Sequence, residues 1–176
     1  MKKFGHKQFV AEYHKVKDKV FTYLMYRVSF NRDIAEDLLM EIILKAYENL
    51  PKYDPEKGSF KSWVFAIAHN ELVNYWRGAK ITQSLDEMEE LGEKAYSRYM
   101  ADEETSKNLE NKKVWQILEF MSQGDKEIIM MRFMDDLNYD EISLIMGKEP
   151  GAIRTQLSRA LDKFRDLYQK FYPSIP

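Results

Sequence analysis

The spacing of the apolar residues constrains the fold of this chain more than any other feature of its sequence. Apolar side chains recur three and four positions apart through most of the 176 residues, while the strict alternation that is typical of strands is almost absent. Hydrophobic residues make up 44% of the chain and charged residues 32%, a balance that favours a folded protein over a disordered one. The sequence therefore predicts an all-α fold.

The first half of the chain is predicted to contain three long helices. They cover three ranges of the sequence, roughly 7–29, 33–50 and 60–77. An Asp33-x-x-Glu36 pattern is typical of a capping box at the start of the second helix, and Pro51 ends that helix because proline cannot continue it. Ser59 is the expected N-cap of the third helix, and Gly78 is its expected end.

A change in composition divides the chain into two small domains. Residues 81–110 carry nine acidic side chains against three basic ones and show only weak periodicity. We therefore expect an acidic linker over residues 79–107, between a first domain at 1–78 and a second domain at 108–176.

The second domain carries the pattern of a helix-turn-helix. Asn138-x-x-Glu141 forms a capping box before a short helix, Gly147 ends that helix, and Pro150 begins a longer one. The outer face of the longer helix offers four side chains that can bond to phosphates or base edges in a major groove, namely Arg154, Thr155, Ser158 and Arg159. A plain helical hairpin with a solvated arginine face is the alternative interpretation.

The region 51–77 has a composition suited to unpaired nucleic acid. Asparagine reads base edges, aromatic rings stack on bases, and cations attract the backbone. The candidate residues are Lys52, Tyr53, Lys57, Ser59, Asn70, Asn74 and Arg77. In the alternative interpretation, the aromatic residues belong to the core and the asparagines are ordinary surface residues.

The second predicted helix is acidic on its polar side. Asp33 and Glu36 can be explained as capping residues, but Asp37 and Glu41 lie four positions apart, where like charges repel. A basic protein partner would explain this pair, and a solvated face remains the alternative.

Several classes of protein are excluded or left without support by the sequence. The absence of cysteine removes disulfides, thiol catalysis and the common zinc modules. The three histidines lack the spacing of metal ligands, and no phosphate-binding loop or catalytic motif occurs, so we expect neither a cofactor nor enzymatic activity. No apolar run is long enough to span a membrane, and the N-terminus lacks a signal peptide, so a cytoplasmic protein is expected.

Three segments together resemble the bacterial RNA polymerase sigma factors of the extracytoplasmic-function (ECF) group. They are DIAEDLLMEIILKAYENL, FKSWVFAIAHNELVNYWR and YDEISLIMGKEPGAIRTQLSRAL, in the order and at the spacing of that family. The resemblance implies a subunit that directs core polymerase to specific promoters and helps to open the DNA. It also implies a sigma region 2-like first domain and a region 4-like second domain.

The resemblance also implies partners for each surface. The acidic helix would dock on the clamp of the polymerase β′ subunit, through Asp33, Glu36, Asp37, Met40 and Glu41. The region 51–77 would read the non-template strand of the minus-ten element, and the last helix would enter the major groove of the minus-thirty-five element. The polymerase β flap and an anti-sigma factor are further implied partners.

Three residues depart from the pattern of this family. Met40 stands where glutamine is usual, Gln156 stands where arginine is common, and Glu149 replaces a serine cap. Because basic residues are few, we expect weak binding to free DNA and useful affinity only together with polymerase. The alternatives are a stand-alone helix-turn-helix regulator of duplex operators and an adaptor that binds polymerase without reading DNA.

Overall fold

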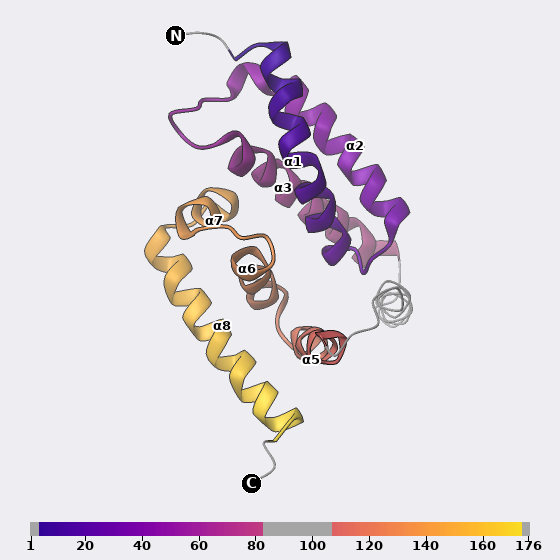
Figure 1. The fold of residues 1–176 in the computed structure, drawn as a ribbon, viewed down its shortest axis with the longest axis vertical. Helices are drawn as coiled ribbons and strands as arrows, with labels where there is room; N and C mark the ends of the chain where they lie inside the picture. Colours follow the sequence, from indigo (N-terminus) through magenta and orange to yellow (C-terminus); the bar gives the residue numbers. More distant parts are fainter. Residues whose placement is uncertain (1–3, 83–106, 174–176) are drawn as a thin grey trace. The chain divides into compact units, whose positions relative to one another are not determined.

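The chain folds into two compact helical units (Figure 1). The structure is a computed structural model that describes residues 4–82 and 107–173. Within those residues the secondary structure consists of seven α-helices and one short 3-10 helix, which confirms the prediction of an all-α fold. Residues 83–106, which make up most of the expected acidic linker, lie outside the described part of the chain.

The first unit is a bundle of three long helices that pack pairwise against one another. Its helices are α1 (His6–Arg27), α2 (Arg32–Glu48) and α3 (Phe60–Thr82), with the 3-10 helix η1 (Leu50–Lys52) following α2. The predicted apolar stripes supply its core, because Val20, Leu24, Ile42, Val64 and Leu72 are all buried.

The predicted N-cap of the second helix is wrong by two residues. Asn31 is the N-cap of α2, since its side chain accepts a hydrogen bond from the Ile34 backbone N–H at 3.2 Å. Asp33 therefore lies in the first turn, where its charge suits the helix dipole. Glu36 pairs with Arg32 instead of forming a capping box with Asp33.

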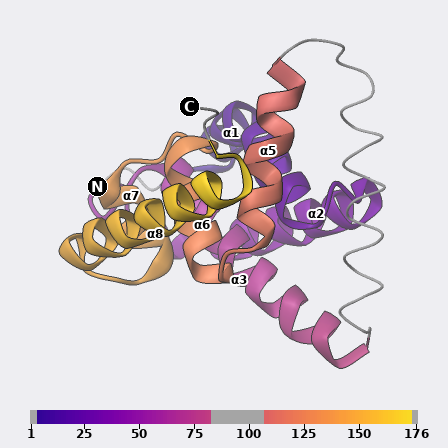
Figure 2. The ribbon, with the colours of Figure 1, turned by 90° about the horizontal axis from the view of Figure 1, so that it is seen from below.

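The expected end of the third helix is also wrong. Gly78 does not close α3, which continues to Thr82 and forms a long helical segment in Figure 2. Among the described glycines only Gly147 has a positive φ, so Gly78 lacks the left-handed conformation of a helix C-cap. The Ser59 cap is confirmed, because its hydroxyl accepts a hydrogen bond from the Ser62 backbone N–H at 3.1 Å.

The second unit is built mainly from four helices. They are α5 (Lys107–Glu119), α6 (Gln123–Phe133), α7 (Tyr139–Met146) and α8 (Pro150–Phe171). The long α8 packs against α5 and α6, and in Figure 1 it runs from the end of α7 to the neighbourhood of α5. Ile153, Leu157 and Ala160 form its buried stripe, as the periodicity predicts.

The turns of the second unit place α7 before α8 as a helix-turn-helix. Asn138 and Glu141 form the predicted capping box, and Gly147 ends α7 with a φ of 63°. Residues 120–122 separate α5 from α6, and the Ser122 side chain caps α6 by accepting a hydrogen bond from the Asp125 backbone N–H at 3.3 Å. The helix consequently begins at Gln123.

Candidate protein and nucleic-acid interfaces

One surface of α2 combines acidic and apolar side chains that are all exposed. We call it the acidic face of α2, and its residues are Asp33, Asp37, Met40, Glu41 and Leu44. Met40 is 61% exposed and Leu44 is 58% exposed, which is unusual for side chains of this size in a helix that packs on two neighbours. Exposed apolar groups rimmed by charges are typical of a protein interface.

The acids of α2 differ in how far their charges are already compensated. Arg32 Nε donates to Glu36 Oε1 at 2.6 Å, and this bond and the carboxylate charge raise the pKa of Arg32. Within the described part of the chain, no hydrogen bond or ion pair involves the side chains of Asp37 and Glu41. Asp37 and Glu41 therefore carry the uncompensated charge of this face.

A partly buried ion pair joins α2 to α3. Lys45 donates to the carboxylate of Glu71, whose side chain is only 10% exposed. Because neighbouring residues on α2 and α3 carry the candidate contacts to partners, this pair holds two candidate interfaces in a fixed relation within one unit. Its two residues lie 26 positions apart, so no local sequence pattern predicts the pair.

The loop between α2 and α3 is anchored by an aromatic cluster. The ring of Tyr53 lies 5.0 Å from Trp63 and 5.6 Å from Phe60, and its hydroxyl donates to the Gly58 carbonyl oxygen at 3.3 Å. Burial is the main cause that raises the pKa of Tyr53. Tyr53 therefore fixes the conformation of the loop, and Ser59 caps the helix that follows it.

The lysines of this loop are exposed and only lightly held. Lys52 donates to the Asn49 side-chain oxygen at 2.9 Å, and Lys57 lies 3.9 Å from an oxygen of Asp54. Both ammonium groups can turn toward a phosphate at little cost, because exposed pairs contribute little to stability.

A polar stripe follows the exposed side of α3. It consists of Asn70, Asn74 and Arg77, which lie on successive turns of the helix and are all exposed. Their side chains take part in no hydrogen bond or ion pair with the rest of the described chain. The adjacent Trp76 is half-buried, and its Nε1 donates to the Arg27 carbonyl oxygen at 3.4 Å.

All four residues predicted on the outer face of the last helix are exposed on α8. The Arg154 guanidinium lies 5.4 Å from the centre of the Tyr139 ring, a cation–π contact that limits the freedom of the arginine. The Thr155 hydroxyl donates back to the Gly151 carbonyl oxygen at 3.0 Å. Ser158 and Arg159 have no internal bond within the residues that the structure describes.

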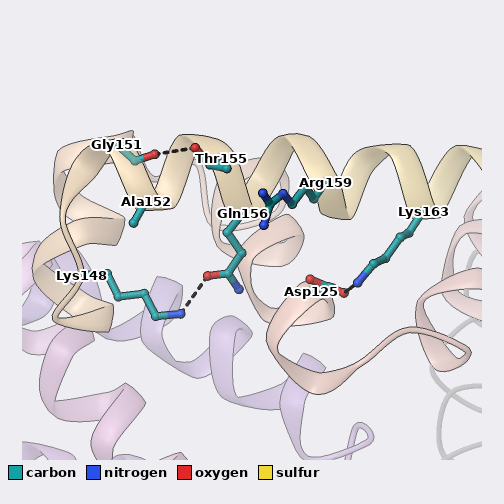
Figure 3. A pocket seen from close by; sticks show the side chains of 8 residues that line it. All are labelled: Asp125, Lys148, Gly151, Ala152, Thr155, Gln156, Arg159 and Lys163. Carbon is teal, nitrogen blue, oxygen red and sulfur yellow. Dashed lines mark hydrogen bonds and ion pairs between the residues drawn. The ribbon is translucent and has the colours of Figure 1, made fainter.

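A hollow lies along one side of α8 and is rich in cations (Figure 3). Its charged lining residues are Asp125, Lys148, Arg159 and Lys163, joined by Gly151, Ala152, Thr155 and Gln156. Lys163 donates to Asp125 at 2.6 Å, and this bond is the main cause that lowers the pKa of that carboxyl. Lys148 and Lys163 are not among the residues predicted from the sequence, although Lys163 follows Arg159 by one helical turn.

Other kinds of site find no support in the described ranges 4–82 and 107–173. There, no group of histidine and carboxylate side chains is arranged to hold a metal ion. No described helix has the length and hydropathy needed to cross a membrane.

Comparison with protein families decides the identity. A model described as "Sigma-70 region 2" matches residues 13–81, and one described as "Sigma-70, region 4" matches residues 111–164. Together the two matches span more than half of the chain; the first lies within the first helical unit and the second lies mainly within the second.

The chain belongs to the ECF group of RNA polymerase sigma factors. It directs RNA polymerase to promoters, and members of this family are non-enzymatic initiation factors. The resemblance found in the sequence, the fold class and the predicted function are thereby confirmed.

Individual relatives agree with this assignment along most of the sigma factor. It is 28% identical to the ECF sigma factor SigM of Bacillus subtilis, over 90% of this chain and 93% of SigM. It is 26% identical to the ECF sigma factor BldN of Streptomyces coelicolor, over 85% of this chain but only 56% of BldN.

Solved structures share its fold. The sigma factor RpoE of Bartonella quintana, solved with the anti-sigma factor NepR, has a TM-score of 0.66 at 20% identity, covering 93% of this chain and 98% of RpoE. CnrH, solved with the cytosolic domain of CnrY, has a TM-score of 0.64 at 16% identity, covering 94% and 90%.

Proposed function

We propose that this sigma factor divides its contacts among three surfaces. The acidic face of α2 binds the β′ clamp of core polymerase, the loop and polar stripe of the first unit bind the unpaired minus-ten strand, and α8 reads the minus-thirty-five duplex. In this scheme residues 1–78 and 108–176 act as separate binding units joined by residues 79–107, with the end of α3 extending into that joint.

The acidic face of α2 supports the polymerase assignment because its chemistry suits a protein and repels DNA. Asp37 and Glu41 would meet basic side chains of the clamp, while Met40 and Leu44 provide the apolar contact. Met40 therefore offers apolar area where the family usually has a polar glutamine. Asp33 and Glu36 stand at the edge of this surface.

The first unit also offers groups that can hold unpaired bases. Asn70 and Asn74 present amides to base edges, and Arg77 with Lys52 and Lys57 attracts the backbone. Tyr53 and Ser59 contribute by fixing the loop that carries the two lysines. Extruding a base from the duplex costs a few kcal/mol. Holding the extruded base in this way would offset that cost and so help to open the duplex.

The outer face of α8 carries the groups needed for major-groove recognition. Arg159 and Arg154 can form paired hydrogen bonds with guanine, and Thr155 and Ser158 can bond to either strand. The contact of Arg154 with Tyr139 holds the arginine near one orientation before DNA arrives.

Two further partners are part of this proposal. The exposed aromatic rings of Phe120 and Phe171, with centres 4.7 Å apart, give the second unit an apolar surface for the β flap. An anti-sigma factor that covers the polymerase-binding surfaces would keep the chain inactive, as a partner of the kind solved with RpoE. A factor working with polymerase acts in the cytoplasm.

The observation that carries the proposal is the availability of the recognition groups. Asp37, Glu41, Asn70, Asn74, Ser158 and Arg159 are exposed and have no internal bonds in the described chain. Groups of these types, left available on three separate surfaces, suit one protein partner and two nucleic-acid elements.

Transcription from a random promoter library, by core polymerase with and without this protein, tests the assignment. Specific start sites should appear only with the protein. Asn74→Ala should slow duplex opening more than formation of the closed complex, whereas Arg159→Ala should relax the preference for the upstream element. Tight binding of duplex DNA without polymerase, together with no specific initiation, would instead indicate a stand-alone regulator.

A further inference from the structure

The hollow beside α8 contains a glutamine whose side-chain amide forms hydrogen bonds through both its nitrogen and its oxygen. Gln156 Nε2 donates to the Gly124 carbonyl oxygen at 3.2 Å, and its Oε1 accepts from Lys148 Nζ at 2.8 Å (Figure 3 shows the second bond). Gly124 lies in the first turn of α6, and Lys148 lies between α7 and α8. One amide therefore links three segments of the second unit.

These bonds limit what Gln156 can do on DNA. A glutamine that reads adenine needs both its amide nitrogen and its amide oxygen for the base edge. In Gln156 the nitrogen donates to Gly124 and the oxygen accepts from Lys148, so turning the amide toward a base edge would break both bonds.

The charge around the amide favours an anion. Among the lining residues Lys163 and the one carboxylate, Asp125, offset each other, which leaves the charges of Lys148 and Arg159. The hollow lies along one side of α8, where a helix placed in a major groove faces the phosphates that border the groove. Gly151 has no side chain and Ala152 has only a methyl group, so neither blocks the approach of a strand.

We propose that Lys148 contacts a backbone phosphate of the minus-thirty-five duplex, and that Gln156 is a positioning residue that holds Lys148 there without reading a base. This inference rests on the proposed placement of α8 in the major groove. Gln156 stands where the family commonly has arginine. The chain therefore supplies the cation, Lys148, from the turn between α7 and α8 instead of from α8 itself.

The test uses the complete protein bound to core polymerase and a DNA fragment selected from a random library by the wild-type complex. Affinity is measured over a range of salt concentrations. Lys148→Ala should lower the slope of log affinity against log salt by about one, because one phosphate contact is lost. Lys112→Ala, which removes an exposed lysine of α5 outside the hollow, should leave the slope unchanged.

A double-variant cycle distinguishes positioning from base reading. Gln156→Ala should weaken binding alone but add little to Lys148→Ala, because both changes remove the same contact. Neither variant should change which upstream sequences are selected from the library. Replacing each phosphate in turn by a neutral methylphosphonate should identify one phosphate that matters to the wild type and not to Lys148→Ala.

Three outcomes would overturn the inference while leaving the proposed function standing. They are an unchanged salt slope in Lys148→Ala, additive losses in the double variant, and an altered base preference in Gln156→Ala. If the wild-type complex selects no promoter at all, the placement of α8 fails, and this inference fails with it. Thermal unfolding of each variant shows that the loss belongs to binding and not to folding.

Discussion

Asp125 places a carboxylate at the edge of a surface proposed to bind DNA, where its charge would repel phosphate. The ion pair with Lys163 offsets this charge. The hydrogen bond from Lys163 lowers the pKa of Asp125 from its ordinary value of 3.8, although partial burial acts in the opposite direction. A carboxyl whose pKa is lowered in the folded state stabilises the fold at neutral pH. That contribution is lost as the pH falls through the folded-state pKa.

Lys163→Met should therefore lower the stability of the second unit at neutral pH and lose its effect in acid. Asp125 takes up a proton only as the pH falls through its folded-state pKa, which lies below its ordinary value of 3.8, and there the wild type loses the ion pair as well. Unfolding temperatures of both proteins, followed by circular dichroism from neutral pH downward, check this expectation. A difference between them that stays constant into acid would contradict it.

The partly buried pair of Lys45 and Glu71 gives a second prediction for single residues. Lys45→Met leaves the carboxylate of Glu71 buried without its cation, and we expect a loss of about 2 kcal/mol, less than a fully buried pair because Lys45 is half-exposed. Lys45→Met/Glu71→Gln should recover most of this loss, because it removes the unpaired charge. Urea unfolding measures both, and a double variant less stable than the single one would refute the explanation.

Sequence patterns predicted which side chains are buried, capping or exposed better than they predicted which side chains pair with each other. The apolar stripes, the Asn138–Glu141 capping box and the exposed residues of α8 follow from local periodicity, so they could be predicted. The pairs Lys45–Glu71 and Lys163–Asp125 join residues 26 and 38 positions apart, and no local pattern encodes which helices meet. The role of Gln156 depends on the same kind of distant contact.

At the scale of a single element, α2 shows why similar acids need not act alike. Its start is set by Asn31, which shifts Asp33 into the first turn and leaves Glu36 to pair with Arg32. A capping pattern in the sequence fits more than one register, and here the asparagine two residues earlier forms the cap. Only the later part of the helix keeps uncompensated carboxylates beside exposed Met40 and Leu44.

Charge removal along α2 should therefore have unequal effects on the association with core polymerase. Asp37→Asn and Glu41→Gln should each slow association by about threefold to tenfold at low salt, since their charges are available to steer the partner. Glu36→Gln should change the rate by less than about twofold, because Arg32 already offsets that charge. Stopped-flow measurements at low and high salt provide the comparison, and a larger effect of Glu36→Gln would refute it.

At the scale of the whole molecule, the proposed scheme uses charge to separate protein contacts from nucleic-acid contacts. The acidic face of α2 suits the enzyme, whereas the amides of α3 and the cations of α8 suit the promoter. Because one chain would carry both kinds of surface in this scheme, binding to polymerase would raise the effective concentration of the DNA-binding groups at the promoter. Few cations are then sufficient, although they would bind free DNA weakly.

The affinity of the complete chain for purified bacterial core polymerase tests this division most directly. Equilibrium titration at moderate salt should give tight binding by the wild type, a loss of at least about tenfold in Asp37→Lys, and no change in Asp18→Lys, which makes the same charge reversal on α1. Absence of binding by the wild type, or equal binding by Asp37→Lys, would contradict the assignment of α2 to the polymerase.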